Sequence, residues 1–125
     1  GDSRVYCLEK NSLDQLTEDH SLVSYLYRQG SISKEDQFTH PKRNVILKAI
    51  GVEDHVEISL TTRRIRSGPL YLLCSDGLTS MVTDREIEKI MKDNTAPELL
   101  CNDLLQAAKN GGGRDNITII IIKVE

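Results

Sequence analysis

Tryptophan is absent from this 125-residue chain and phenylalanine occurs once, which excludes an aromatic core and leaves Leu, Ile and Val to fill the interior. Cysteine is also scarce. The three cysteines form no C-x-x-C pair, which argues against a zinc site, and their odd number argues against a disulfide framework. Such cysteine usage is typical of a reducing compartment, so we expect a cytoplasmic protein.

Long apolar runs and strong net charge are missing as well. No run approaches the roughly 20 residues needed to cross a bilayer, so we expect no membrane segment in this chain. The net charge is only −3, and no basic stripe with interleaved aromatic side chains is present, so nucleic acid is not an expected partner. The length suits one domain over residues 1–125. Because no Met precedes Gly1, we expect that domain to be part of a larger protein.

Strands and helices are mixed along the chain in an order that contains few strand–helix–strand units. We predict strands over 5–8, 13–16, 56–60, 70–74 and 117–124, and helices that begin near Asp19, Ser33, Thr83 and Thr95. The strand over 56–60 alternates apolar and polar residues and is expected to be half-buried. The run over 117–124 is rich in Ile, which favours a central strand. This order favours an α+β fold with a mostly antiparallel sheet.

The two helices of the second half of the chain each begin with a capping motif. Thr83 and Glu86 have the spacing at which each side chain satisfies the other's backbone N–H. Thr95 and Glu98 repeat that spacing. We therefore predict a capping box at the start of both helices.

Two aspartates stand where an apolar strand meets a loop that contains glycine. Asp76 follows the strand over 70–74, and Asp115 precedes the strand over 117–124. If these strands are antiparallel neighbours, the two carboxylates converge at one edge of the sheet. Converging carboxylates need a cation, a proton or an arginine to coexist, and oxygen ligands without His or Cys suit Mg²⁺ or Mn²⁺. On spacing alone, two turn aspartates with no metal are an equally good interpretation.

Four stretches, in the same order, resemble the metal-dependent protein serine/threonine phosphatases of the 2C type, especially the bacterial ones. They are Gly1–Arg4, Leu16–Ser21, Cys74–Leu78 and Gly112–Thr118. Each stretch alone is a weak signal, whereas the ordered set is specific and covers essentially the whole chain. The resemblance implies part of an α-β-β-α sandwich of two mainly antiparallel sheets flanked by helices, with the N-terminal part missing. It also implies that residues 19–51 form a flap-like insert.

The same resemblance implies a function and a set of site residues. Asp76 and Asp115 match ligands of a binuclear Mg²⁺ or Mn²⁺ centre, and Asp2 matches the acid that helps to bind a third metal in bacterial members. A metal-activated water would hydrolyse phosphoserine or phosphothreonine in a phosphoprotein substrate, as expected of a signalling hydrolase. No residue of this chain matches a catalytic residue other than these ligands.

The chain also departs from the family pattern. The phosphate-binding Arg, the Asp that bridges the two metals and an acidic ligand of the second metal belong to elements that the chain does not contain. We therefore expect the chain alone to be inactive and to require the missing N-terminal half, and exposed sheet edges to favour self-association. Two alternatives stay open: a degenerate phosphatase that serves as a binding module, and an autonomous α+β domain without metal.

Overall fold

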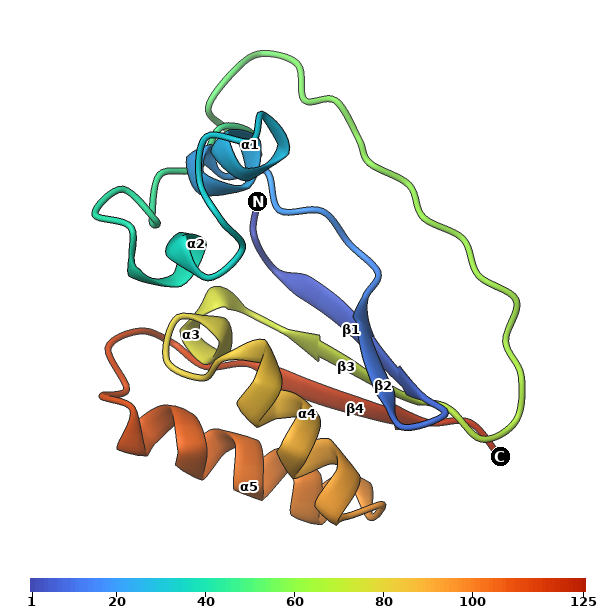
Figure 1. Cartoon of the computed structure of the whole chain (residues 1–125). Coiled ribbons are helices and arrows are strands. Elements are labelled where there is room, and N and C mark those ends of the chain that lie inside the picture. The colour runs from blue at the N-terminus through green and yellow to red at the C-terminus, as the bar shows by residue number, and fades with distance from the viewer. The chain divides into compact units, whose positions relative to one another are not determined.

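The computed structural model describes all 125 residues, which fall into two compact units. The first unit comprises residues 1–2 and 18–61, and the second comprises residues 3–17 and 62–125. Figure 1 shows the course of the chain through both. No helix has the length and apolar character needed to cross a membrane.

The first unit contains two short helices, α1 (Leu22–Arg28) and α2 (Asp36–Thr39). Helix α1, which the sequence predicted to begin near Asp19, is capped by Ser21, whose hydroxyl accepts the Ser24 N–H at 3.2 Å. The chain terminus is fixed to this unit, because the Gly1 amino group donates to the Lys48 carbonyl at 2.8 Å. The segment 19–51 lies within this unit. Its role as a flap stays a prediction.

The second unit is built on a four-stranded sheet in the order β2-β1-β3-β4, in which every neighbouring pair is antiparallel. The strands are β1 (Arg4–Glu9), β2 (Ser12–Gln15), β3 (Leu70–Cys74) and β4 (Ile119–Lys123). Strands β1 and β2 form a hairpin in which Lys10 and Asn11 both have positive φ. The predicted α+β class with an antiparallel sheet is confirmed.

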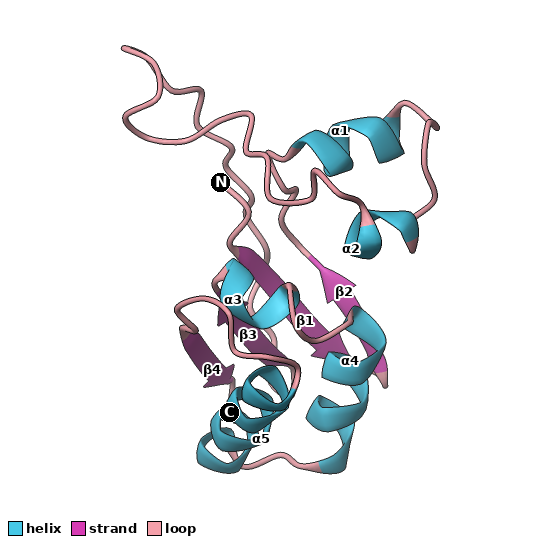
Figure 2. Ribbon diagram, turned by 90° about the vertical axis from the view of Figure 1, so that its left-hand side faces the viewer, coloured by secondary structure: helices cyan, strands magenta, loops and turns pink.

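Three helices lie on one face of this sheet, as Figure 2 shows: α3 (Asp76–Thr79), α4 (Asp84–Asp93) and α5 (Pro97–Asn110). Alternate strand residues meet them, because successive side chains of a strand point to opposite faces. The core between sheet and helices is fully aliphatic apart from one tyrosine and the sulfur-containing side chains. Its buried members are Tyr6, Leu70, Leu72, Cys74, Leu78, Val82, Ile87, Met91, Leu100, Leu104 and Ala108.

Tyr6 is the polar anchor of this core. Its hydroxyl donates to the Asp84 carboxylate at 2.7 Å and accepts from the Arg4 guanidinium at 2.8 Å. Burial raises the pKa of the Tyr6 hydroxyl far above its usual value, so the group stays a neutral donor. The contact joins β1 to the first turn of α4, where a carboxylate is also favoured by the helix dipole.

Two predictions about strands were wrong. Residues 56–60 form no strand, and the side chains of Ile58 and Leu60 are 83% and 85% exposed. Strand β4 lies at an edge of the sheet, since it pairs with β3 alone, and it is not central. Both errors have one physical reason: an apolar pattern indicates that a segment is buried in the native protein. In this chain residues 56–60 have no strand partner, and β4 has a partner on one side only.

Only one of the two capping boxes forms. At α4, the Thr83 hydroxyl accepts the Glu86 N–H at 3.3 Å and the Glu86 carboxylate accepts the Thr83 N–H at 2.8 Å. At α5 the N-cap is Ala96, with no side-chain hydrogen bond, so the box predicted at Thr95 and Glu98 is wrong. Pro97 stands at the start of the helix, where its missing N–H costs nothing.

This difference gives a matched pair of variants. We expect Thr83→Ala to lower the free energy of unfolding by about 1 kcal/mol, because it removes the acceptor for the Glu86 backbone N–H in the first turn of α4. Thr95→Ala makes the same chemical change at a position that caps nothing and should leave stability nearly unchanged. Urea denaturation followed by circular dichroism measures both, and equal losses would contradict the assignment of the caps.

Candidate functional site

The end of β3 and the start of β4 lie side by side. Cys74, the last residue of β3, is opposite Ile119, the first residue of β4. Asp76 comes two residues after Cys74, and Asp115 comes four residues before Ile119. The antiparallel pairing on which the sequence prediction depended is therefore confirmed, and the loops with the two aspartates leave the sheet at the same edge (Figure 1).

Ser75 ties these two loops together with three hydrogen bonds. Its N–H donates to the Thr118 carbonyl at 3.1 Å, and its hydroxyl accepts the Thr118 N–H at 3.0 Å. The same hydroxyl donates to the Asn116 carbonyl at 3.1 Å. Ser75 therefore fixes the backbone next to both aspartates. Sequence reasoning considered this serine only as a nucleophile and missed its structural role.

Gly77 allows the loops to approach each other more closely than any other residue would. A Cβ atom at this position would lie 2.1 Å from the Asn116 carbonyl oxygen and 2.8 Å from its carbon, well inside contact distance. The backbone of α3 thus lies directly against the residue that follows Asp115. The glycine of the motif Ser75-Asp76-Gly77 was the sequence signal for this close approach, because glycine is required where two backbones meet.

The two carboxylates differ in exposure. Asp76 is the first residue of α3 and is partly buried, whereas Asp115 is exposed. The Asp115 carboxylate accepts the N–H of Asn116 at 2.7 Å, which orients it along its own loop.

Asp2 belongs to the first unit, where the hydrogen bonds of Gly1 to Lys48 and His20 hold the start of the chain. That Asp2 lies near Asp76 and Asp115 stays a prediction. The structure contains no group of three or more His, Cys, Asp or Glu side chains that could hold a metal ion.

The chemistry of the donors fits a hard cation. Each loop offers one carboxylate, while the cysteines are the buried Cys7 and Cys74 and the partly buried Cys101. Mg²⁺ is usually bound by one or two carboxylates together with water and substrate oxygens, so two carboxylates suit it without a full protein cage. A zinc site would need imidazole or thiolate ligands that neither loop provides.

These features define an α+β protein whose candidate site is a pair of carboxylate loops at one edge of an antiparallel sheet. No model of a known protein family matches the chain. The serine/threonine phosphatase Stp of Listeria welshimeri is 46% identical over 123 residues, which are 98% of this chain and 49% of that protein.

Solved structures agree with this similarity. The crystal structure of the Mycobacterium tuberculosis serine/threonine phosphatase PstP/Ppp superposes with a TM-score of 0.92 at 38% identity, over all of this chain and 52% of that one. The catalytic domain of PstP in complex with two manganese ions superposes with a TM-score of 0.82 at 36% identity, over 97% of this chain and 49% of that one.

This chain is homologous over its whole length to bacterial serine/threonine phosphatases, so the resemblance predicted from its motifs is confirmed. It spans about half the length of the relatives that it matches.

Proposed function

We propose that this chain is one half of the catalytic domain of a metal-dependent protein serine/threonine phosphatase, with phosphoserine or phosphothreonine proteins as substrates. The supporting observation is the pair of loops bearing Asp76 and Asp115, tied together by Ser75 in a chain homologous to phosphatases. None of the three cysteines forms a disulfide, as is usual in the reducing cytoplasm, where we place the protein.

In this proposal Asp76 and Asp115 are metal ligands, and Asp2 is a further one. Bound Mg²⁺ or Mn²⁺ would activate a water molecule for attack on phosphorus and would neutralise the phosphoryl oxygens. The two-manganese structure of PstP supports the choice of metal. Within this chain, Ser75 holds the two loops in register, and Gly77 lets them come close enough for both carboxylates to face one ion.

The face of the sheet turned away from the helices is the proposed contact surface for the other half. The register places Val5, Leu73 and Ile120 in one row across this face, and Ile122 lies in the next. Ile120 and Ile122 are 50% and 45% exposed. An exposed apolar face of this kind indicates that a second layer of the domain packs on it. When two sheets pack face to face, such rows of side chains are buried between them. Without that layer, edge strand β4 is a site for self-association.

Metal titration tests the ligand assignment. We expect Asp76→Asn and Asp115→Asn to weaken Mn²⁺ binding by at least about tenfold, because each removes a negative charge that offsets the dehydration of a hard cation. Asp103→Asn, on the exposed face of α5, makes the same change away from the loops and should bind as the unmodified chain does. Isothermal titration calorimetry measures the three affinities. Equal affinity in all three variants would refute the assignment.

A further inference from the structure

The loop that carries Asp115 contacts the segment around α3 at two places, one on each side of Asp115. The first contact, with Ser75 and Gly77, lies on the side toward β4. The second lies on the other side, where α5 ends and the chain turns through Gly111. A Cβ atom on Gly111 would lie 2.8 Å from the Met81 carbonyl oxygen and 3.1 Å from the Met81 Cβ.

Space, and not backbone conformation, requires glycine at position 111. Gly111 has a φ of −72° and a ψ of −6°, right-handed values that residues of any type adopt. Its N–H continues the pattern of α5 and donates to the Ala107 carbonyl at 2.9 Å. A larger residue could not lie this close to Met81, because the Met81 carbonyl is backbone and cannot rotate away. The turn is therefore in close contact with the residue that follows α3 and its C-cap.

The side chain of Met81 covers the next residue of the same turn. Its Sδ atom would lie 3.5 Å from a Cβ on Gly112, which is ordinary van der Waals distance. Met81 itself is half-buried. A flexible thioether fills irregular gaps of this kind well. Met81 thus lies against the turn with its carbonyl, its Cβ and its sulfur.

Helix α3 links the two contacts. The Ser80 N–H donates to the Asp76 carbonyl at 2.8 Å, and the Met81 N–H donates to the Leu78 carbonyl at 3.0 Å. Met81 is therefore fixed to the helical turn that begins with Asp76, and Leu78 anchors that turn in the core, where it is fully buried. One compact element holds the first aspartate and contacts the loop of Asp115 on both sides.

We propose that Met81 and Gly111 are positioning residues of the metal site. They fix the loop of Asp115 on the side away from β4, so that its carboxylate stays within reach of an ion held by Asp76. A loop that is ordered before the metal arrives loses less conformational entropy on binding, and its affinity is higher for that reason. The inference rests on the proposed function for the assignment of the two aspartates as ligands. The contacts themselves lie within the second unit.

Gly111→Ala tests the proposal by calorimetric titration with Mn²⁺. We expect binding to weaken by about tenfold, as for other residues that orient metal ligands, because the added methyl group meets the Met81 carbonyl and the turn must move. Gly68→Ala is the matched control in the same unit. Gly68 has a φ of +108° and nothing within 4 Å of an added Cβ, so alanine strains the backbone away from the loop and should leave Mn²⁺ affinity unchanged.

Met81→Ala and Met81→Leu form a second pair that introduces no backbone clash. Met81→Ala uncovers the turn and should weaken Mn²⁺ binding several-fold. Met81→Leu nearly conserves the volume and should regain most of the affinity. This rescue would not be expected if the side chain had no part in placing the loop.

Amide hydrogen exchange without metal gives a readout that does not depend on binding. The Thr118 N–H donates to the Ser75 hydroxyl at 3.0 Å, and the Asn116 N–H donates to the Asp115 carboxylate at 2.7 Å. Both amides should exchange faster in Gly111→Ala and in Met81→Ala, while the amides of β3 exchange as slowly as in the unmodified chain.

The outcomes separate this inference from the proposed function. If Asp76→Asn and Asp115→Asn weaken Mn²⁺ binding while Gly111→Ala and Met81→Ala do not, the positioning role is wrong. Unchanged exchange of the loop amides in Gly111→Ala would also overturn it. Normal Mn²⁺ binding by the two aspartate variants would instead refute the ligand assignment.

Discussion

This chain alone should hydrolyse a phosphoserine peptide at least about a thousandfold more slowly than it does after mixing with the half of a relative that it does not cover. The reaction needs two metals held about 3.5–4 Å apart so that one water is oriented for in-line attack. Asp76 and Asp115 supply two carboxylates, and the structure contains no cluster of three or more potential ligands. The family resemblance places the bridging Asp and the phosphate-binding Arg in the other half.

The missing Arg and the missing second metal act in the same catalytic step. The rate losses that they cause should therefore not multiply as independent factors. Without the Arg the phosphate loses a bidentate anchor, and without the second metal the water is neither activated nor aligned. A phosphopeptide assay with Mn²⁺ measures the rate before and after mixing with the uncovered half of the Listeria protein. Asp76→Asn should abolish the recovery, whereas Asp103→Asn should preserve it. Full turnover by this chain alone would contradict both the proposed site and the proposed division of the domain.

The elements that local patterns specify were predictable from the sequence. The strand Leu70–Cys74 and the helix after Thr83 both have their signals within a few residues: an apolar run and a capping box. The sequence analysis assumed the antiparallel pairing of the last two strands, on which the approach of the aspartate loops depends, and the structure confirms that assumption.

The errors occurred where a pattern depends on residues outside the chain. Residues 56–60 have the alternation of a half-buried strand, but a strand needs a hydrogen-bonded neighbour, and here Ile58 and Leu60 are exposed. The Ile-rich β4 has the composition of a central strand and stands at an edge. Both patterns fit a domain in which the other half covers these segments, and this agrees with the half-length match to the relatives.

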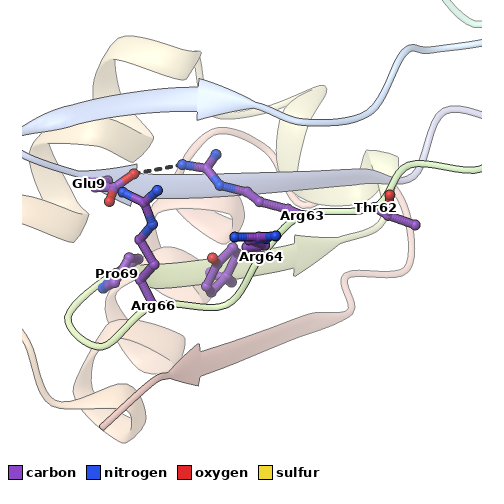
Figure 3. A pocket seen from close by; sticks show the side chains of 7 residues that line it. Glu9, Thr62, Arg63, Arg64, Arg66 and Pro69 are labelled. Atoms are coloured by element: carbon purple, nitrogen blue, oxygen red, sulfur yellow. Dashed lines mark hydrogen bonds and ion pairs between the residues drawn. The ribbon is translucent and has the colours of Figure 1, made fainter.

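The ion pair between Glu9 and Arg63 (Figure 3) was not predictable because the two residues are distant in sequence. Glu9 ends one hairpin strand, and Arg63 lies 54 positions further along the chain. The approach of Gly77 to Asn116 is likewise a fact of tertiary structure. A motif can show that glycine is present, but only the register of β3 and β4 shows which backbone lies against it.

Gly77→Ala should destabilise the second unit by about 3 kcal/mol and weaken Mn²⁺ binding together with it. The added methyl group would overlap the Asn116 carbonyl oxygen at 2.1 Å, and both partners are backbone, so neither can rotate away as a side chain would. Overpacking of a rigid site typically costs 1–3 kcal/mol, and a backbone clash belongs at about the upper end. The loops must separate, which also breaks the bonds of Ser75 to Asn116 and Thr118.

Gly30→Ala is the matched control for this variant. Gly30 has a φ of +73° and nothing within 4 Å of an added Cβ, so alanine there suffers backbone strain without a clash. That strain costs about 1 kcal/mol and should leave Mn²⁺ affinity unchanged. Urea denaturation gives both free energies of unfolding, and calorimetry gives both affinities. If Gly77→Ala were as stable as the unmodified chain, the close packing of the two aspartate loops would be wrong, and with it the basis for placing Asp76 and Asp115 on one ion.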